Sequence, residues 1–366
     1  MNKYLIIPLA AIAMLASCSK VQTVGEKVDR AISFQAAGYA TKLGITGAQL
    51  PTSESFGVYS WTDNTSGPYF MDNEVVSFQE DELWKTATPY YWPPTQTVDF
   101  FCFYPAKMKE LTVDKTKITF TAYDVASTQQ DVMYADKAVG FADNPENVPG
   151  SVSGYDGVPA LFHHALAKLT IHVALAYNHK EEVDGTVTDW SVTVNSMSLK
   201  GVFKKGDCEL VLADTPEIGL VGWNRPSGNV WTHDDSLIEE KNLLNAATEL
   251  DVDKAITALP EMFVLPQTLA AGQQQVALNV TIKTRRNGAD FLTETYDVVR
   301  DLLVPDSLEA WQMNHSLTYS LSFNPLRSGG SGPVDPDNPD LTDATICFAP
   351  AAGGWDAVDV AAVINL

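Results

Sequence analysis

The chain has few of the groups that bind nucleic acid. It carries 24 lysines and arginines against 46 aspartates and glutamates in 366 residues, which gives a formal net charge of -22. A chain this acidic repels the phosphates of a polyanion, and no basic run long enough to hold them is present. We therefore expect no nucleic-acid partner, and we interpret the acidity as a source of solubility and colloidal repulsion at a crowded surface.

Motifs of catalysis and cofactor binding are also missing. The sequence has no G-x-S-x-G, no Walker A, no G-x-G-x-x-G after an expected strand and no C-x-x-C. Carboxylate pairs such as Asp81 and Glu82 are common in any acidic chain and do not indicate an acid/base site. We predict that the protein is not an enzyme and has no catalytic residues, no metal site and no cofactor.

Three histidines are candidate metal ligands, because imidazoles that share a strand face can converge on one ion. His164 and His172 have the same parity along an expected strand, and His163 precedes them. Eight residues of strand separate His164 from His172 by roughly 26 Å, which is too far for a shared ion. We therefore interpret all three as hydrogen-bonded or exposed histidines.

The first residues form a secretory signal. Lys3 supplies a positive charge, an apolar run from Leu5 to Met14 follows, and the run closes with Leu15-Ala16-Ser17-Cys18. The apolar core is too short to span a bilayer as a helix. The pattern L-A-S-C is the lipobox of bacterial lipoproteins, so we predict a signal peptide over residues 1–17 and lipidation of Cys18, which would attach the chain to the outer membrane.

Loss of residues 1–17 removes one lysine and no acid, so the mature charge becomes -22 - 1 = -23. If Cys18 is lipidated, Cys102, Cys208 and Cys347 remain, and an odd number cannot be fully paired within one chain. Cys102 lies in an apolar, aromatic run and is predicted to be a buried free thiol.

The residue pattern of the mature chain is typical of β-strands. Short runs alternate polar and apolar residues and are rich in β-branched and aromatic side chains: Lys117 to Tyr123, Lys168 to Leu175, Ser191 to Val194, Gln275 to Ile282 and Ser316 to Phe323. Turn signals between strands occur at Asn287-Gly288, Lys205-Gly206-Asp207 and Asp184-Gly185. We predict an all-β protein of antiparallel sandwiches, with Ser236 to Leu250 as the best helix candidate.

Composition divides the chain further. We predict a lipidated leader over residues 18–30, an N-terminal β-sandwich over 31–182, a C-terminal β-sandwich over 183–326 and a linker over 327–340. The linker contains Ser328-Gly329-Gly330-Ser331-Gly332-Pro333 and a run of alternating aspartates and prolines.

Beyond the linker, residues 341–366 regain strand character. Apolar side chains occupy alternate positions at Val358, Val360, Ala362, Ile364 and Leu366. A terminal strand on a linker can fold back onto its own sheet or insert into a neighbouring subunit, and both arrangements fit the pattern.

Several runs together resemble the fimbrillin family, the pilus subunits and related surface lipoproteins of gut and oral anaerobes. The similarity lies in Pro89-Tyr90-Tyr91-Trp92-Pro93, Val98 to Pro105, Leu161 to Leu169, Ser198-Leu199-Lys200-Gly201-Val202, Phe263-Val264-Leu265-Pro266-Gln267, and Trp311 to His315 leading into Tyr319. The most specific piece is the F-x-H-x-L-x-K-L run from Phe162 to Leu169. Cys102 departs from the family pattern, where a small residue is commoner, and Asn314-His315 replaces a frequent glycine.

The resemblance implies two tandem transthyretin-like β-sandwich domains and a cell-surface pilus whose subunits assemble by donor strand exchange with neighbouring subunits. In the family, an arginine-specific protease removes an N-terminal segment. Arg30 and Ala31 are the matching candidates for proteolytic processing, and Val358 to Leu366 is the candidate donor strand. Cleavage there would also release the lipid on Cys18.

The sequence also allows a second function, that of a surface lipoprotein that binds glycans through tryptophan side chains. The chain has eight tryptophans, of which Trp223 and Trp231 are the candidates for contact with a sugar. Most of the tryptophans lie in strand-like runs and are expected in the core.

Overall fold

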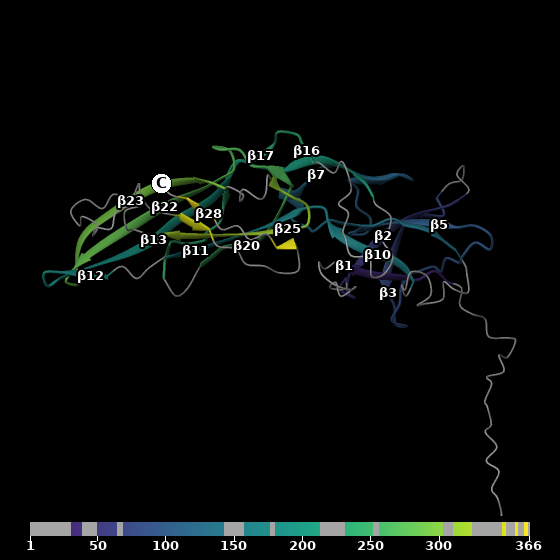
Figure 1. The fold of residues 1–366 in the computed structure, drawn as a ribbon, viewed down its shortest axis with the longest axis horizontal. Helices are drawn as coiled ribbons and strands as arrows, with labels where there is room; N and C mark the ends of the chain where they lie inside the picture. The colour runs from purple at the N-terminus through teal and green to yellow at the C-terminus, as the bar shows by residue number, and fades with distance from the viewer. Residues whose placement is uncertain are drawn as a thin grey trace, which may run out of the picture.

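The computed structural model shows an elongated, almost entirely β protein with two lobes and a smaller sheet between them (Figure 1). It describes residues 31–38, 50–63, 69–142, 157–175, 180–212, 231–251, 256–302 and 310–323, and the backbone of 346–348, 356–357 and 362–364. Within these ranges the one helix is the single turn α1 (Val125–Thr128), and no helix there is long and apolar enough to cross a membrane. The prediction of an all-β fold is confirmed.

The first lobe is a sheet that closes on itself. Its strands are β1 (Phe34–Gly38), β2 (Ser55–Thr62), β3 (Met71–Phe78), β4 (Trp84–Thr86), β5 (Val98–Tyr104), β8 (Met133–Ala135), β9 (Ala138–Phe141) and β10 (Val158–His164). They follow the order β2-β3-β4-β1-β10-β8-β5-β9, and β2 also pairs with β5, which closes the ring. The pairing of β1 with β10 is parallel. Alternate residues such as Phe56, Val58, Phe100 and Cys102 form its buried interior.

The connecting layer is a four-stranded sheet of order β16-β15-β7-β6. Its strands are β6 (Leu111–Val113), β7 (Lys117–Asp124), β15 (Lys205–Val211) and β16 (Thr232–His233). It shares a buried cluster with the opposite faces of β2 and β5, where Tyr59 and Phe103 point. Leu265 and Met313 from the second lobe belong to the same cluster, so one apolar core spans both lobes.

The second lobe places two sheets face to face. One sheet has the order β20-β11-β25-β26-β28, with β27 beside β25, and the other has the order β12-β13-β22-β23, with β18 and β19 beside β13. The strands are β11 (Ala167–Leu175), β12 (Lys180–Val183), β13 (Thr186–Lys200), β18 (Lys241–Asn242), β19 (Thr248–Glu249), β20 (Ile256–Val264), β22 (Gln275–Arg286), β23 (Ala289–Asp301), β25 (His315–Phe323), β26 (Ile346–Phe348), β27 (Asp356–Ala357) and β28 (Ala362–Ile364). Two further pairs join β14 (Val202–Phe203) to β17 (Leu237–Ile238) and β21 (Gln267–Thr268) to β24 (Ala310–Trp311).

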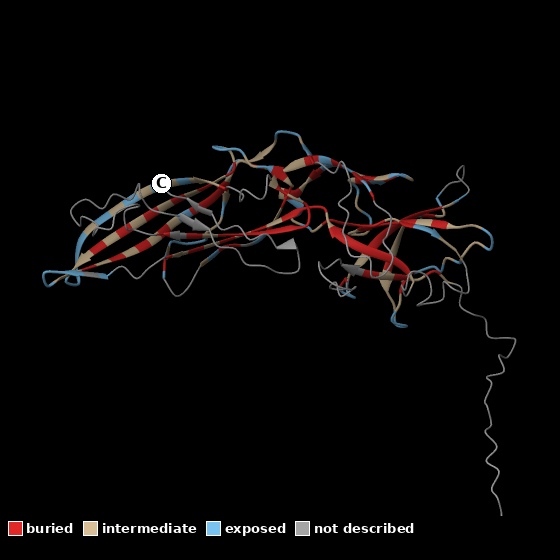
Figure 2. Cartoon of the chain, in the orientation of Figure 1, coloured by how far each residue is buried: buried red, intermediate tan, exposed pale blue. Residues whose placement is uncertain are grey.

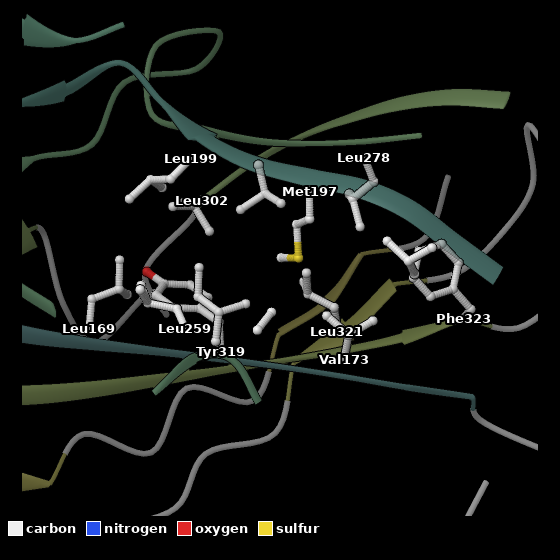
Figure 3. Close-up of a cluster of buried hydrophobic side chains, with 14 of the residues drawn as sticks. Leu169, Val173, Met197, Leu199, Leu259, Leu278, Leu302, Tyr319, Leu321 and Phe323 are labelled. Carbon is white, nitrogen blue, oxygen red and sulfur yellow. The ribbon is translucent and has the colours of Figure 1, made fainter. Parts of the chain in front are cut away.

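Apolar side chains from both sheets interdigitate in the space between them (Figure 3). Leu169 and Val173 of β11 alternate with half-buried neighbours, and Leu321 and Phe323 of β25 belong to the same buried cluster. Opposite them lie Met197 and the inward residues of β22, so period-two patterning in the sequence becomes the core of this lobe. Figure 2 shows the same alternation as bands of buried and partly buried residues along these strands.

Two predicted turns are confirmed and one is wrong. Asp184-Gly185 and Asn287-Gly288 both have positive φ at both residues, which is the type I′ hairpin geometry that matches strand twist. Lys205-Gly206-Asp207 instead begins strand β15. A bulge between Gly206 and Cys208 accommodates the glycine, and the carbonyl of Thr232 would lie only 2.6 Å from a Cβ there. The glycine therefore serves close strand approach, not a turn.

The helix predicted over Ser236 to Leu250 is also wrong. This segment contains the three short strands β17, β18 and β19, of which the last two lie along the free side of β13. Its backbone is hydrogen-bonded to that strand, as in the contacts from the Leu243 N–H to the Met197 carbonyl and from the Leu250 N–H to the Val192 carbonyl. Pairing with an existing strand edge therefore outweighs the local helical pattern.

The two-domain division of the sequence stays a prediction. The boundary near residue 182 follows β11, yet the side chains of β11 belong to the buried cluster of the second lobe. Strand β7, which lies before that boundary, pairs with β15, which lies after it. The connecting layer thus takes strands from both sides of the predicted boundary.

Candidate functional site

The residue that follows the predicted processing site is paired within the first lobe. Ala31 forms a bridge to Tyr91, and the Ile32 N–H donates to the Tyr90 carbonyl at 2.8 Å. The next residues along that partner segment include Pro93 and Pro94, which have no N–H to continue the ladder. Ala31 and Ile32 therefore join the first lobe through the segment around Tyr91.

Strand β1 follows this point directly and is well held. It pairs in parallel with β10 from Phe34–Val158 to Gly38–Phe162, and Phe34 also pairs with Trp84. The Phe34 side chain is buried and packs edge-to-face against Phe56 and Phe100, with ring centroids 5.7 and 5.6 Å away. Such contacts make β1 part of the first core, so a chain that starts at Ala31 keeps this strand.

The C-terminal segment extends a sheet of its own chain. Ser322 of β25 pairs with Cys347 of β26, and β26 pairs along its length with β28. Short β27 pairs in parallel with the start of β25. Of the predicted donor strand, Ala362 and Ile364 lie in β28, whereas Val358, Val360 and Leu366 lie outside the described residues. Of the two arrangements left open by the sequence, this structure has the folded-back one.

Long unpaired edges remain elsewhere. Within the described ranges, the 13-residue strand β23 pairs only with β22 and closes one side of its sheet, while β20 closes the other sheet on the side opposite β28. Inward residues of β23, including Leu292, Tyr296 and Val298, are half-buried because no further strand covers that side. Edges of this kind carry free backbone N–H and C=O groups and can accept another strand.

The cysteines contribute no reactive thiol to the described surface. Cys102 and Cys208 are buried and free, which confirms the prediction for Cys102. Burial raises the pKa of both thiols, that of Cys208 to about 12, so neither is a thiolate at neutral pH. The side chain of Cys347 and all of Cys18 lie outside the described residues.

Each of the three histidines has its own polar partner, which for His172 is the Thr257 hydroxyl. His163 is buried with its Nε2 3.0 Å from Asp136 Oδ1, and His164 Nδ1 lies 2.7 Å from Asp131 Oδ2. The idea that His164 and His172 share one strand is wrong, because the buried pair Ala165-Leu166 separates β10 from β11. Among the residues that the structure describes, no cluster of three or more His, Cys, Asp or Glu side chains could hold a metal ion.

Of the two tryptophan candidates, Trp231 is not exposed to a sugar. Trp231 is only 2% exposed, and its indole N–H donates to the Ala165 carbonyl at 2.9 Å inside the connecting layer. Trp223 lies outside the described residues. Trp61, Trp84, Trp190 and Trp311 are buried as well, which agrees with the expectation that most tryptophans are core.

One polar cavity of about 590 Å³ lies in the second lobe, beside the interruption between β12 and β19 along β13. Its lining consists of Leu175, Lys180, Asp189, Trp190, Ser191, Glu249, Leu250 and Asp251. The nearby hydrogen bond from the Leu175 N–H to the Asp251 carbonyl, at 3.4 Å, is long for a backbone bond.

Comparison with known proteins places the chain in a family. It belongs to the fimbrillin-like family, whose model matches residues 43–338. No curated relative matches the chain.

Solved structures similar to this chain include two from gut bacteria. A fimbrial protein from Bacteroides vulgatus has a TM-score of 0.45 at 16% identity, over 80% of this chain and 95% of that one. A proposed cell adhesion protein from Bacteroides uniformis has a TM-score of 0.43 at 16% identity, over 80% and 94%. Membership of the fimbrillin-like family supports a pilus or adhesin role at the cell surface.

Proposed function

We propose that the chain is a structural subunit of a surface pilus, exported as a lipoprotein and assembled by exchange of its C-terminal strand. The observation that carries the proposal is the family match over residues 43–338. It is supported by the position of the C-terminal strands at a sheet edge.

Strand exchange uses the ordinary physics of a sheet edge. An added strand gains main-chain hydrogen bonds, and its alternate side chains fix the register. In the isolated chain, β26 and β28 occupy the edge beside β25. In the polymer, the same segment occupies an edge of the next copy. The strand pairing lost within one copy is then replaced by strand pairing between copies, as in domain swapping. The 327–340 linker supplies the reach.

Export and release make up the other half of the proposal. Acylation of Cys18 attaches the chain to the outer membrane, and cleavage after Arg30 separates the folded subunit from that lipid. The bridge between Ala31 and Tyr91 supports this site, because a chain that begins at Ala31 keeps that pairing with the first lobe. A subunit that is not cut stays attached to the membrane.

Deletion of residues 341–366 tests the strand exchange. Surface protein from the producing cell, run on unboiled gels, is expected to show a ladder of high-mass species for the full chain and a folded monomer alone for the deletion. Ile364→Asp is expected to shorten the ladder sharply, because it charges the apolar face of the strand, while Asn365→Asp on the other face is the matched control. A ladder that survives the deletion would show that this segment is not the donor.

The mass of the mature protein tests processing. Wild-type protein is expected to start at Ala31 without lipid, and Arg30→Ala is expected to start at an acylated Cys18 and to stay with the membrane. Lys27→Ala serves as the control for an arginine-specific protease and should be processed normally. A wild-type mass that corresponds to an acylated start would refute the cleavage.

A further inference from the structure

Strand β23 is the longest of the described strands that close a sheet in the second lobe. Within the described ranges it pairs only with β22, over 13 residues, and it lies at the outer side of the lobe (Figure 1). An edge of this length presents a row of backbone N–H and C=O groups to which another strand can pair.

Two other edges of the same lobe are protected against such pairing. Natural proteins shorten, charge or interrupt their edge strands so that copies do not join. Strand β12 has only four residues, of which the first three are charged. Strand β20 contains Pro260, and its pairing with β11 shifts register twice. Strand β23 has neither a proline nor a register shift from Leu292 to Asp301, so it is open to pairing over this stretch.

Apolar side chains lie uncovered on both faces of β23. Leu292, Tyr296 and Val298 are on the core face and remain half-buried. On the opposite face, Phe291 is 44% exposed and Val299 is 46% exposed. A further strand beside β23 would cover residues on both faces at once.

The charges of β23 restrict how a second copy of this strand can pair with it. Two identical antiparallel strands related by a two-fold axis place one residue opposite itself. A register centred on Glu294 or Asp297 places two like charges directly opposite each other, which is destabilising. A register centred on residue 293 places Leu292 opposite Glu294, and one centred on residue 296 places Leu292 opposite Arg300.

A register with Thr295 opposite itself has none of these conflicts. It places apolar residues opposite apolar residues, and each acid opposite a hydroxyl that can donate to it. The apolar pairs are Phe291–Val299 and Leu292–Val298, and the acids pair as Glu294–Tyr296 and Asp297–Thr293. The stretch from 291 to 299 is therefore complementary to the same stretch of a second copy.

A row of hydrogen-bonded polar side chains crosses the sheet to this central position. The Asn195 side chain on β13 donates to Thr281 Oγ1 on β22 at 2.7 Å, and the hydroxyls of Thr281 and Thr295 lie 2.9 Å apart. The row reaches the edge at Thr295. Thr295 of a second copy would continue it, because threonine pairs directly across antiparallel strands stabilise a sheet.

Net charge does not oppose the approach of two copies at this edge. The β22–β23 hairpin, residues 275–301, carries four lysines and arginines and four aspartates and glutamates, a net charge of 4 - 4 = 0. The hairpin therefore differs from the chain as a whole, whose net charge of -22 makes most surfaces repel each other.

We infer that β23 pairs antiparallel with β23 of a second copy of this chain, with Thr295 at the two-fold axis, so that two sheets become one. The inference goes beyond the proposed pilus function, since it uses no part of residues 341–366. Two strand edges bury less than the roughly 800 Å² per partner of a standard interface. The pairing is therefore a lateral contact between copies that a surface already holds at high effective concentration.

Cysteine crosslinking on the cell surface tests the pairing. Thr295→Cys is expected to give a covalent dimer with a short thiol-specific crosslinker, because the two Cβ atoms would lie about 5 Å apart. Thr293→Cys is the matched control on the same face, since its two copies would lie roughly 13 Å apart along the strands. On boiled gels, the dimer yield above that of the wild-type chain is expected to be at least tenfold higher at position 295 than at position 293.

A mixture of two variants tests the register. Thr293→Cys and Asp297→Cys chains made in the same cell are expected to crosslink to each other at least tenfold more than either variant crosslinks alone, because these positions face each other across the axis. Equal yields at 295 and 293, no dimer at 295 above the wild-type background, or no gain from the mixture would each overturn the inference.

A pair of valine substitutions tests the complementarity. Val299→Asp in the Thr295→Cys chain places a carboxylate opposite Phe291 and is expected to lower the dimer yield at least fivefold. Val211→Asp is the matched control, because Val211 of β15 is similarly exposed, at 49%, and should leave the yield unchanged. Thermal unfolding of both proteins within a few degrees of the wild type separates a lost contact from a lost fold, and equal yields in the two variants would refute the pairing.

Discussion

Gly201 is the position where a single added methyl group should have the largest effect. It lies between β13 and β14, with φ of +73°, and its N–H donates to the Ile238 carbonyl at 2.9 Å. A Cβ built on this glycine would lie 1.8 Å from the Gln273 carbonyl oxygen and 2.7 Å from its carbon. The Gly201→Ala variant must therefore both adopt a left-handed conformation and displace the backbone of a neighbouring turn.

The cost follows from these two effects. A left-handed residue other than glycine costs about 1–2 kcal/mol, and crowding that moves backbone typically costs about 1–3 kcal/mol more. Alanine also restricts the unfolded chain, which returns about 0.4–1 kcal/mol. We expect Gly201→Ala to lower the free energy of unfolding by about 2–4 kcal/mol.

Gly185→Ala separates the two effects. Gly185 has a similar φ of +80° but nothing within 4 Å of a built Cβ, so only the conformational term applies and the loss should be about 1 kcal/mol. Urea unfolding followed by tryptophan fluorescence measures both variants, since Trp231 and Trp311 are buried and report on the folded cores. Equal losses for the two variants would refute the claim that Gly201 is required by the approach of Gln273.

Three other outcomes are expected. Trp231→Phe should lower the free energy of unfolding by about 1–3 kcal/mol, measured by urea unfolding, because it leaves the buried Ala165 carbonyl without its indole donor; an unchanged midpoint would contradict that hydrogen bond. Cys102 and Cys208 should resist iodoacetamide at pH 8 in the native protein and react fully in urea, as read by mass spectrometry, whereas native labelling at either would contradict their burial. Burial raises the pKa of Tyr123 from about 10 to about 12, so the folded state keeps a proton that the unfolded state loses, and stability present below pH 10 should decline as pH rises toward 12. Urea midpoints at pH 9 and pH 11.5 should differ less in Tyr123→Phe than in the wild type, and an equal shift would exclude Tyr123 as a source.

Much of the fold could be predicted because strand patterning is local. All five alternating runs became strands, and the two asparagine-glycine and aspartate-glycine turns have the geometry that their residues favour. The pairing partners could not be predicted, since parallel β1–β10 and the ring closure between β2 and β5 join segments far apart in sequence. The helix predicted over Ser236 to Leu250 was wrong because that segment pairs with the edge of β13. The turn predicted at Lys205-Gly206-Asp207 was wrong because Gly206 lies at a bulge within β15.

Site prediction succeeded and failed for similar reasons. Cys102 was correctly predicted to be buried, because aromatic residues flank it in the sequence. The alternative in which Trp231 contacts a sugar was wrong. Nothing in the neighbouring sequence indicates that its indole N–H donates to the Ala165 carbonyl.

The central strand of the second lobe sets the order in which the protein can fold. Lys168 of β11 pairs with Ser316 of β25, and nearly the whole second lobe lies between them in sequence. A chain made from its N-terminus therefore holds β11 without its parallel partner until residue 323 is available. Contacts of such long sequence separation slow folding, so the second lobe can close only after the last strand that β11 needs has been made.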